Sequence, residues 1–120
     1  MPLISIVDDD ESVRNALKSL IDSVGFRAEV FDSGEKFLNS PYLSQTDCLI
    51  ADVRMPGMSG LELQDRLSAA GRSIPIVFIS AHDDKEARDR GLRAGAIDFL
   101  QKPFSEDSLL GAISVCLDKS

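Results

Sequence analysis

Short apolar runs alternate with amphipathic segments along the whole chain, without an internal repeat or a low-complexity tract. The runs at residues 3–7, 48–51 and 74–79 are almost continuously apolar, as is typical of inner strands covered on both faces. Residues 26–31 alternate between apolar and charged positions, and the run at 96–100 is short, which favours edge strands. The pattern therefore predicts five strands, with the second and the fifth at the edges.

The segments between these runs carry helix signals. Asp10 precedes a stretch with apolar residues at helical spacing. Asp32, Ser59 and Asp83 are each followed three residues later by glutamate, the spacing of a capping box, and predict three more helix starts. Ser105 opens the last predicted helix. The fourth helix is expected to pack through small residues, namely Ala87, Gly91 and Ala94.

Five β/α repeats with short connections predict an α/β fold, in which a parallel sheet has helices on both faces and the crossovers are right-handed. With the second and fifth strands at the edges, the expected strand order is 2-1-3-4-5. This is a single-domain, doubly wound (βα)5 arrangement of the flavodoxin-like kind. Its ligand crevice is expected at the carboxyl ends of the strands, between strands one and three.

Composition narrows the function classes. At 120 residues the chain is expected to form one domain, residues 1–120, and its hydrophobic content of 43% is ordinary for a globular protein. The net charge of −7 argues against direct nucleic acid binding, which depends on basic residues that neutralise phosphates. No apolar stretch could cross a bilayer and no signal peptide is recognised, so we expect a cytoplasmic protein without membrane association. Cys48 and Cys116 lack CxxC spacing and are expected to be buried free thiols.

Residues with chemical functions follow four of the predicted strands directly. Asp8 and Asp9 come after the first strand, Asp52 after the third, Ser80 after the fourth and Lys102 after the fifth. Because the carboxyl ends of parallel strands lie along one edge of a sheet, these groups are expected to meet there. The sequence therefore predicts one cleft with three carboxylates, a hydroxyl and an ammonium.

Carboxylates this close together raise each other's pKa, and a divalent cation relieves the repulsion. Mg²⁺ prefers oxygen ligands and is typically held by one or two carboxylates with a phosphate. We expect Asp9 and Asp52 to be direct Mg²⁺ ligands and Asp8 to act through water. The backbone carbonyl of Arg54 is expected as a further ligand. Asp10 is instead expected to cap the first helix.

Asp52 is also the candidate phosphoacceptor, because an aspartate can take a phosphoryl group as an acyl phosphate. In phosphoryl transfer the protein mainly positions groups and neutralises charge on the phosphoryl oxygens. Mg²⁺ is expected at one oxygen, Lys102 at another, and the Ser80 hydroxyl as a donor to a third. Pro103 raises the hypothesis of a cis peptide that aims Lys102 inward.

Four motifs together carry a family resemblance over the whole chain: Asp8-Asp9, residues 52–60 (Asp-Val-Arg-Met-Pro-Gly-Met-Ser-Gly), Ser80-Ala81 and Lys102-Pro103-Phe104. They resemble the response-regulator receiver domain of bacterial two-component systems. Their detailed residue pattern is similar to that of the nitrogen-fixation regulator (FixJ-like) subfamily. The resemblance implies that Asp52 accepts phosphate from the phosphohistidine of a sensor histidine kinase. It also implies that Asp8 and Asp9 bind Mg²⁺, and that Lys102 and Ser80 contact the phosphoryl group.

The resemblance further implies a switch. A phosphoryl group on Asp52 would draw Ser80 inward, and Phe99, which matches the family's rotating aromatic, could turn into the vacated space. The face made by helix four, strand five and helix five would then change to control dimerisation or an output domain, usually one that binds DNA and regulates transcription. Phe99 as a plain core residue is the alternative. Arg54 and His82 flank the site and could shield the acyl phosphate from water or steer the donor, with an exposed loop histidine as the alternative for His82.

Other interpretations remain open at this point. The chain could be a receiver excised from a longer regulator or a stand-alone single-domain response regulator that acts on a protein partner. A receiver of either kind dephosphorylates itself and is not a multiple-turnover enzyme. A Mg²⁺-dependent aspartyl-phosphate phosphatase of the haloacid-dehalogenase type lacks its expected Ser or Thr, and a flavodoxin-like electron carrier lacks its phosphate loop. A degenerate receiver that only binds partners fits poorly with the complete acidic set.

Overall fold

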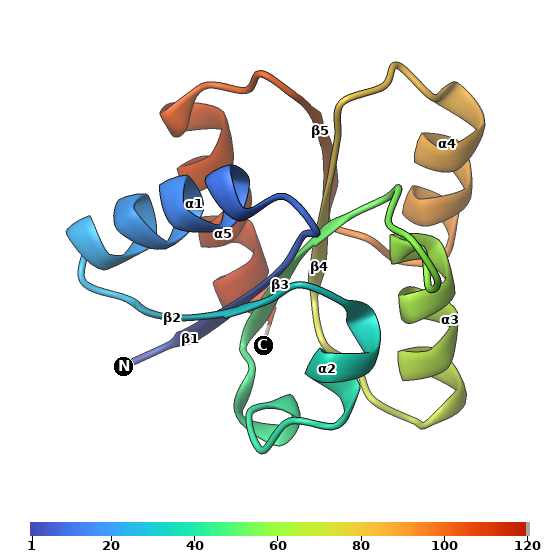
Figure 1. Ribbon diagram of the computed structural model, residues 1–120, viewed down its shortest axis with the longest axis horizontal. Helices are drawn as coiled ribbons and strands as arrows, with labels where there is room; N and C mark the ends of the chain where they lie inside the picture. The colour runs from blue at the N-terminus through green and yellow to red at the C-terminus, as the bar shows by residue number, and fades with distance from the viewer. Residues whose placement is uncertain (120) are drawn as a thin grey trace.

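The computed structural model describes residues 1–119, and its five parallel strands follow the order β2-β1-β3-β4-β5 (Figure 1). This confirms the predicted fold class and strand order. The strands are β1 (Leu3–Val7), β2 (Arg27–Phe31), β3 (Cys48–Asp52), β4 (Ile76–Ser80) and β5 (Asp98–Gln101). The helices are α1 (Glu11–Ser23), α2 (Gly34–Leu38), α3 (Gly60–Ala69), α4 (Lys85–Arg93) and α5 (Glu106–Lys119), with a short 3-10 turn at Leu43–Gln45.

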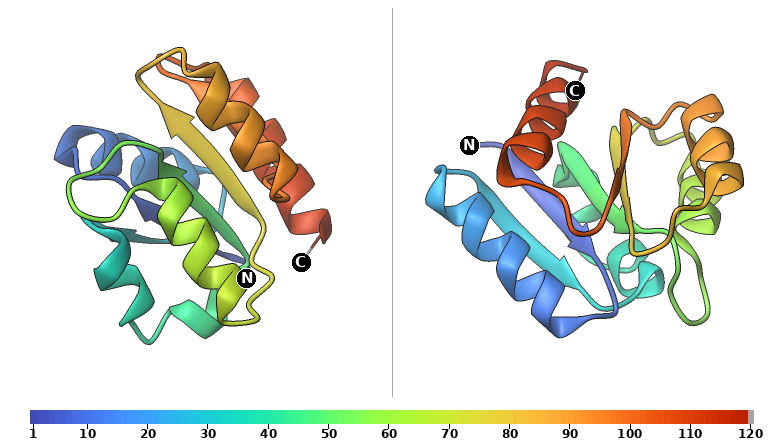
Figure 2. Two further views of the ribbon diagram at one scale, coloured as in Figure 1. Left: turned by 90° about the vertical axis from the view of Figure 1, so that its right-hand side faces the viewer. Right: turned by 90° about the horizontal axis from the view of Figure 1, so that it is seen from above.

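The helices form one layer on each face of the sheet. Helices α1 and α5 cover one face, and α2, α3 and α4 cover the other (Figures 1 and 2). Every residue of β1, β3 and β4 is buried, which explains why these strands read as apolar runs, whereas β2 is partly exposed at the edge. Two apolar clusters result, one on each side of the sheet, and together they fix the strand ends in place.

The strand register brings the carboxyl ends level with one another. Val7, the last residue of β1, pairs with Ala51 of β3, and Asp52 pairs with Ile79 of β4. Ser80 in turn pairs with Gln101 of β5. The residues that follow these positions therefore emerge along one edge of the sheet.

The predicted helices are present, but two of them begin at a different N-cap residue from the one expected. Ser59 caps α3 in a complete capping box with Glu62, and Asp10 caps α1, as expected. The caps of α2 and α4 are Ser33 and Asp84, each one residue later than predicted. In both cases two adjacent residues are good N-caps, and only the backbone geometry selects between them.

Three further expectations need correction. Strand β4 begins at Ile76 and not at residue 74, and Pro75, which has no N–H to give to a ladder, precedes it. Strand β5 begins at Asp98, two residues later than expected. Ala94 is exposed at the end of α4, so only Ala87 and Gly91 supply the small-residue packing that was predicted.

The two cysteines are buried free thiols, as predicted. They are also neighbours: a hydrogen bond with Cys116, together with burial, raises the pKa of Cys48 well above its usual range. Among residues 1–119, none of the helices combines the length and the apolar character that a membrane span needs.

Candidate functional site

Three carboxylates meet at the carboxyl edge of the sheet. Oxygens of Asp8, Asp9 and Asp52 all lie within 4.8 Å of one another. Asp8 and Asp52 are buried at the ends of β1 and β3, whereas Asp9 is exposed at the rim. The structure thus brings together the three acids that the sequence placed in one cleft, and it leaves one of them open to solvent.

Lys102 supplies the positive charge of this cluster. Its Nζ lies 2.9 Å from Asp8 Oδ2 and 3.5 Å from Asp52 Oδ2. The side chain of Asp8 is completely buried, and its Oδ1 accepts a hydrogen bond from the Asp10 backbone N–H. The Lys102–Pro103 peptide is cis, as the sequence suggested. Lys102 therefore bridges two carboxylates that come from different strands.

The negative charges of the cluster outnumber its positive charge. Burial, and then the negative charges of Asp8 and Asp9, raise the pKa of Asp52 from 3.8 to about 6. The charge of Lys102 and the Arg54 backbone N–H oppose the rise in that pKa. For Lys102, burial acts to lower the pKa, but contacts with Asp8 and Asp52 outweigh it and raise the pKa. One ammonium thus only partly compensates three acids.

This donor set fits a hard divalent cation. Its members are carboxylate oxygens, which Mg²⁺ prefers over nitrogen or sulfur ligands. The charges of Asp8 and Asp9 contribute to the raised pKa of Asp52, and such an ion would neutralise this part of the effect. The exposed position of Asp9 leaves the cluster open on its solvent side. The acidic cluster could therefore bind a metal ion.

Ser80 lies buried at the end of β4, next to the cluster in strand order. Its Oγ accepts a hydrogen bond from the His82 backbone N–H, and its carbonyl accepts one from the Lys102 backbone N–H at 2.7 Å. The second bond holds the end of β5 against β4. The hydroxyl proton of Ser80 is left for another acceptor, which suits the donor role predicted for it.

Two of the remaining predicted residues have clear surroundings. Phe99 is buried, with its ring centroid 6.5 Å from that of Phe78, and the Arg88 guanidinium lies 5.9 Å from the Phe99 centroid. The Arg54 backbone N–H donates to Asp52 Oδ1, while its guanidinium pairs with Asp84. His82 is exposed in the loop after β4.

Three residues support the site, although the sequence analysis assigned them no role in it. Arg14 donates to the backbone carbonyl of Asp8 at 2.8 Å, from the first turns of α1. Gly60 lies so close to the carbonyl of Asp52 that a Cβ at this position would overlap it. Asp84 binds the Arg54 guanidinium across 30 residues of sequence. Only Gly60 carried a signal, because a glycine at a helix start has low helix propensity and needs a reason.

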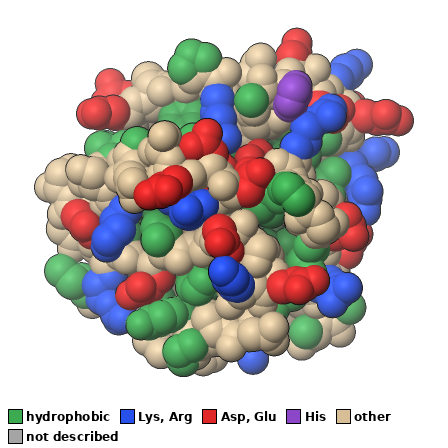
Figure 3. Space-filling view, in the orientation of Figure 1, with side chains coloured by type: hydrophobic (Ala, Val, Ile, Leu, Met, Phe, Trp, Pro, Cys, Tyr) green, Lys and Arg blue, Asp and Glu red, His purple; other side chains and the backbone are tan. Residues whose placement is uncertain are grey.

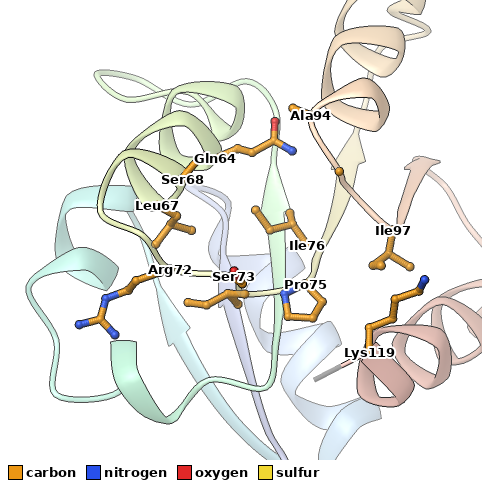
Figure 4. Close-up of a pocket in the computed structure, with 12 residues that line it drawn as sticks. Gln64, Leu67, Ser68, Arg72, Ser73, Pro75, Ile76, Ala94, Ile97 and Lys119 are labelled. Carbon is orange, nitrogen blue, oxygen red and sulfur yellow. The ribbon is translucent and has the colours of Figure 1, made fainter.

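Charged side chains of both signs are interspersed over the face shown in Figure 3, with acidic groups near its centre. A separate pocket of about 310 Å³ lies at the opposite edge of the sheet, where β4 and β5 begin (Figure 4). Gln64, one of its lining residues, donates to the Gly91 carbonyl and so links α3 to α4. None of the predicted site residues lines this pocket.

Fold and site together define a doubly wound α/β domain with an acidic cleft at the point where the strand order reverses. Residues 4–114 match the family model described as the response regulator receiver domain. The chain belongs to this family. It is thus a signalling domain rather than a conventional enzyme, which decides against the phosphatase and electron-carrier interpretations.

Relatives support this assignment at the level of sequence and of structure. The chain is 50% identical to response regulator protein TmoT of Ectopseudomonas mendocina over 115 residues, which cover 96% of this chain and 52% of TmoT. It is 40% identical to transcriptional regulatory protein FixJ of Bradyrhizobium diazoefficiens, over 92% of this chain and 54% of FixJ. The solved structure of response regulator StyR is similar with a TM-score of 0.91 and 50% identity, over 98% of this chain and 59% of that one.

These matches agree with the FixJ-like character of the motifs, and transcriptional regulators are among the homologues. The chain spans about half the length of the curated relatives it matches.

Proposed function

We propose that residues 1–120 form the phosphoacceptor domain of a two-component response regulator, and that Asp52 takes a phosphoryl group from the phosphohistidine of a sensor histidine kinase. The observation that carries this proposal is the meeting of Asp8, Asp9 and Asp52 with the ammonium of Lys102 at one edge of the sheet. A cytoplasmic location belongs to the same proposal.

The acidic cluster would hold Mg²⁺. Asp9 and Asp52 are the proposed direct ligands, and Asp8 acts through water. The Arg54 backbone carbonyl is the remaining ligand that the protein supplies. When bound, the ion supplies positive charge that neutralises the acids and a phosphoryl oxygen. Asp8 is already hydrogen-bonded to Lys102 and to the Asp10 N–H, which supports an indirect role for this residue.

The chain's own groups position the transfer. A carboxylate oxygen of Asp52 attacks phosphorus, the bond from phosphorus to the donor imidazole nitrogen breaks, and that nitrogen keeps the electron pair. Lys102, which lies 3.5 Å from the attacking carboxylate, turns to a phosphoryl oxygen as charge moves there. Ser80 donates its hydroxyl proton in a hydrogen bond to another oxygen. In autodephosphorylation, water later attacks phosphorus and returns the carboxylate.

The proposed output is a change on the face made by α4, β5 and α5. Movement of Ser80 toward the phosphoryl group would free space behind β4, and Phe99 would turn into it from its position beside Phe78. This would control dimerisation, or an output domain that binds DNA and regulates transcription. The names of the transcriptional regulators among the relatives support the second outcome.

The test is incubation with acetyl phosphate and Mg²⁺, followed by intact mass spectrometry. We expect the gain of a single phosphate, which Asp52→Asn and a chelator both abolish. Asp65→Asn is the matched control, because Asp65 is an exposed carboxylate of α3 and should leave uptake unchanged. Uptake that persists in Asp52→Asn, or no uptake by the unmodified protein, would contradict the proposal.

A further inference from the structure

Arg54 and Asp84 form an ion pair between the two loops that flank the proposed phosphoacceptor. Arg54 Nη2 lies 2.9 Å from Asp84 Oδ2, and 30 residues separate them in the chain. The backbone N–H of Arg54 also donates to Asp52 Oδ1, at 3.3 Å. The main chain of Arg54 thus contacts the phosphoacceptor carboxylate, while its side chain is held by Asp84.

Asp84 has a second task that uses its other oxygen. Its Oδ1 accepts the Ala87 backbone N–H at 3.1 Å and so caps α4. This hydrogen bond, and then the Arg54 guanidinium, lower the pKa of Asp84. Because capping and ion pairing use separate oxygens, Asp84 can lose Arg54 and still cap the helix.

The ion pair is exposed enough to exchange. The side chains of Arg54 and Asp84 are 57% and 26% accessible, and such pairs contribute little to stability. An acyl phosphate on Asp52 would carry a charge of about −1.5 to −2 on three acceptor oxygens, in place of the single negative charge of the carboxylate. A guanidinium binds phosphate oxygens in two parallel hydrogen bonds, so the phosphoryl group is a strong competitor for Arg54.

We propose that Asp84 is a positioning residue, which holds the Arg54 guanidinium away from the unmodified site, and that phosphorylation transfers Arg54 from Asp84 to the phosphoryl group. There the guanidinium hinders water from attacking phosphorus, the step that breaks the bond between phosphorus and the Asp52 oxygen and releases inorganic phosphate. Competition by Asp84 therefore shortens the lifetime of the acyl phosphate. This inference rests on the proposed function.

The test is a double-mutant cycle on the lifetime of the acyl phosphate. The protein is phosphorylated with acetyl phosphate and Mg²⁺, the donor is removed, and the loss of phosphate is followed by intact mass. Asp84→Asn keeps an N-cap side chain but removes the charge, so the lifetime should lengthen about twofold to fivefold, the range for an exposed pair. Arg54→Ala should shorten it about threefold to tenfold.

The double variant separates this role from a structural one. In the Arg54→Ala background, Asp84→Asn should no longer change the lifetime, and Arg54→Lys should restore part of the loss caused by alanine. Asp65→Asn breaks the comparable exposed pair of Asp65 with Arg90, also between α4 and a neighbouring element, and should have no effect. If Asp84→Asn and Arg54→Ala change the lifetime of the acyl phosphate additively, and the unmodified protein is phosphorylated, only this inference fails. If the unmodified protein takes up no phosphate, the proposed function fails with it.

Discussion

Lys102 and Asp8 are 94 residues apart in the chain, yet the ammonium of Lys102 donates to Asp8 Oδ2 at 2.9 Å. The Asp8 side chain has no solvent exposure, and that of Lys102 is 19% exposed. A buried carboxylate needs a partner, because desolvation without one costs several kcal/mol. Lys102 is therefore a structural counter-ion as well as the proposed phosphoryl contact, and the two roles can be separated by experiment.

Lys102→Met should destabilise the metal-free protein by about 2–3 kcal/mol, because it leaves Asp8 buried without its cation. Urea unfolding at pH 7 measures the change. Lys36→Met is the control, since Lys36 pairs with Asp32 on the surface at 3.1 Å and should cost less than about 0.5 kcal/mol. Equal effects of the two substitutions would show that Lys102 does not compensate a buried charge.

Asp52→Asn should stabilise the metal-free protein at pH 7. Burial and the neighbouring acids raise the pKa of Asp52 to about 6 in the folded state, against 3.8 as the ordinary value. Between pH 4 and 6 the folded protein therefore keeps a proton that the unfolded chain has lost, and this contribution to stability disappears as the pH rises. One pH unit corresponds to about 1.4 kcal/mol, and solvent access reduces the expected gain at pH 7 to about 1–2 kcal/mol.

The comparison is made by urea unfolding of both proteins in a chelator at pH 4 and pH 7. The difference between them should be small at the lower pH and largest at the higher one. Other titrating groups contribute similarly to both proteins, so the change in the difference belongs to Asp52. A wild-type protein that is the more stable of the two at pH 7 would contradict the prediction.

Mg²⁺ should raise the melting temperature of the wild-type protein. At ten times the dissociation constant, a ligand that binds only the folded state adds about 1.4 kcal/mol, or about 5–10 °C for a domain of this size. Asp9→Asn should remove most of this shift with little change in the metal-free protein, because Asp9 is exposed. Thermal unfolding with and without chelator measures both. An equal shift in wild type and Asp9→Asn would exclude Asp9 as a ligand.

Gly60→Ala should be costly, because the added Cβ would overlap the backbone carbonyl of Asp52 and also press against the Phe78 ring. We expect a loss of about 1–3 kcal/mol, typical of overpacking, together with reduced phosphate uptake because the end of β3 must shift. Gly111→Ala is the matched control in α5. Nothing crowds a Cβ there, so alanine should stabilise the protein by about 0.5–1 kcal/mol. Unfolding and intact mass measurements check both variants.

Phe99→Ala should separate phosphate uptake from its consequence. Uptake at Asp52 should persist, because the Phe99 ring packs against Phe78 and the Arg88 guanidinium and not among the acidic groups that would take part in the transfer. Phosphate-dependent dimerisation, followed by light scattering with and without acetyl phosphate, should be lost. If phosphate-dependent dimerisation is unchanged in Phe99→Ala, Phe99 is a core residue and not part of the switch.

Much of the fold and of the candidate site could be predicted because the signals are local. Hydrophobic periodicity and capping residues act over a few positions, and they identified all five strands and most helix starts, although β4 and β5 each begin two residues later than predicted. They failed by one residue at Asp32 and Asp83, where two adjacent residues can cap. The meeting of Asp8, Asp9 and Asp52 could also be expected, because parallel strands deliver their carboxyl ends to one edge.

The sequence by itself therefore determined which elements form, in what order, and which chemical groups share the cleft. Only the tertiary structure decided how those groups divide their interactions: Asp8 is buried against Lys102 while its neighbour Asp9 faces solvent, and the Arg54 guanidinium turns to Asp84. Such choices depend on side-chain directions and on packing between segments that are far apart in the chain. No pattern along the chain encodes them, because each partner's position is set by a different strand or helix.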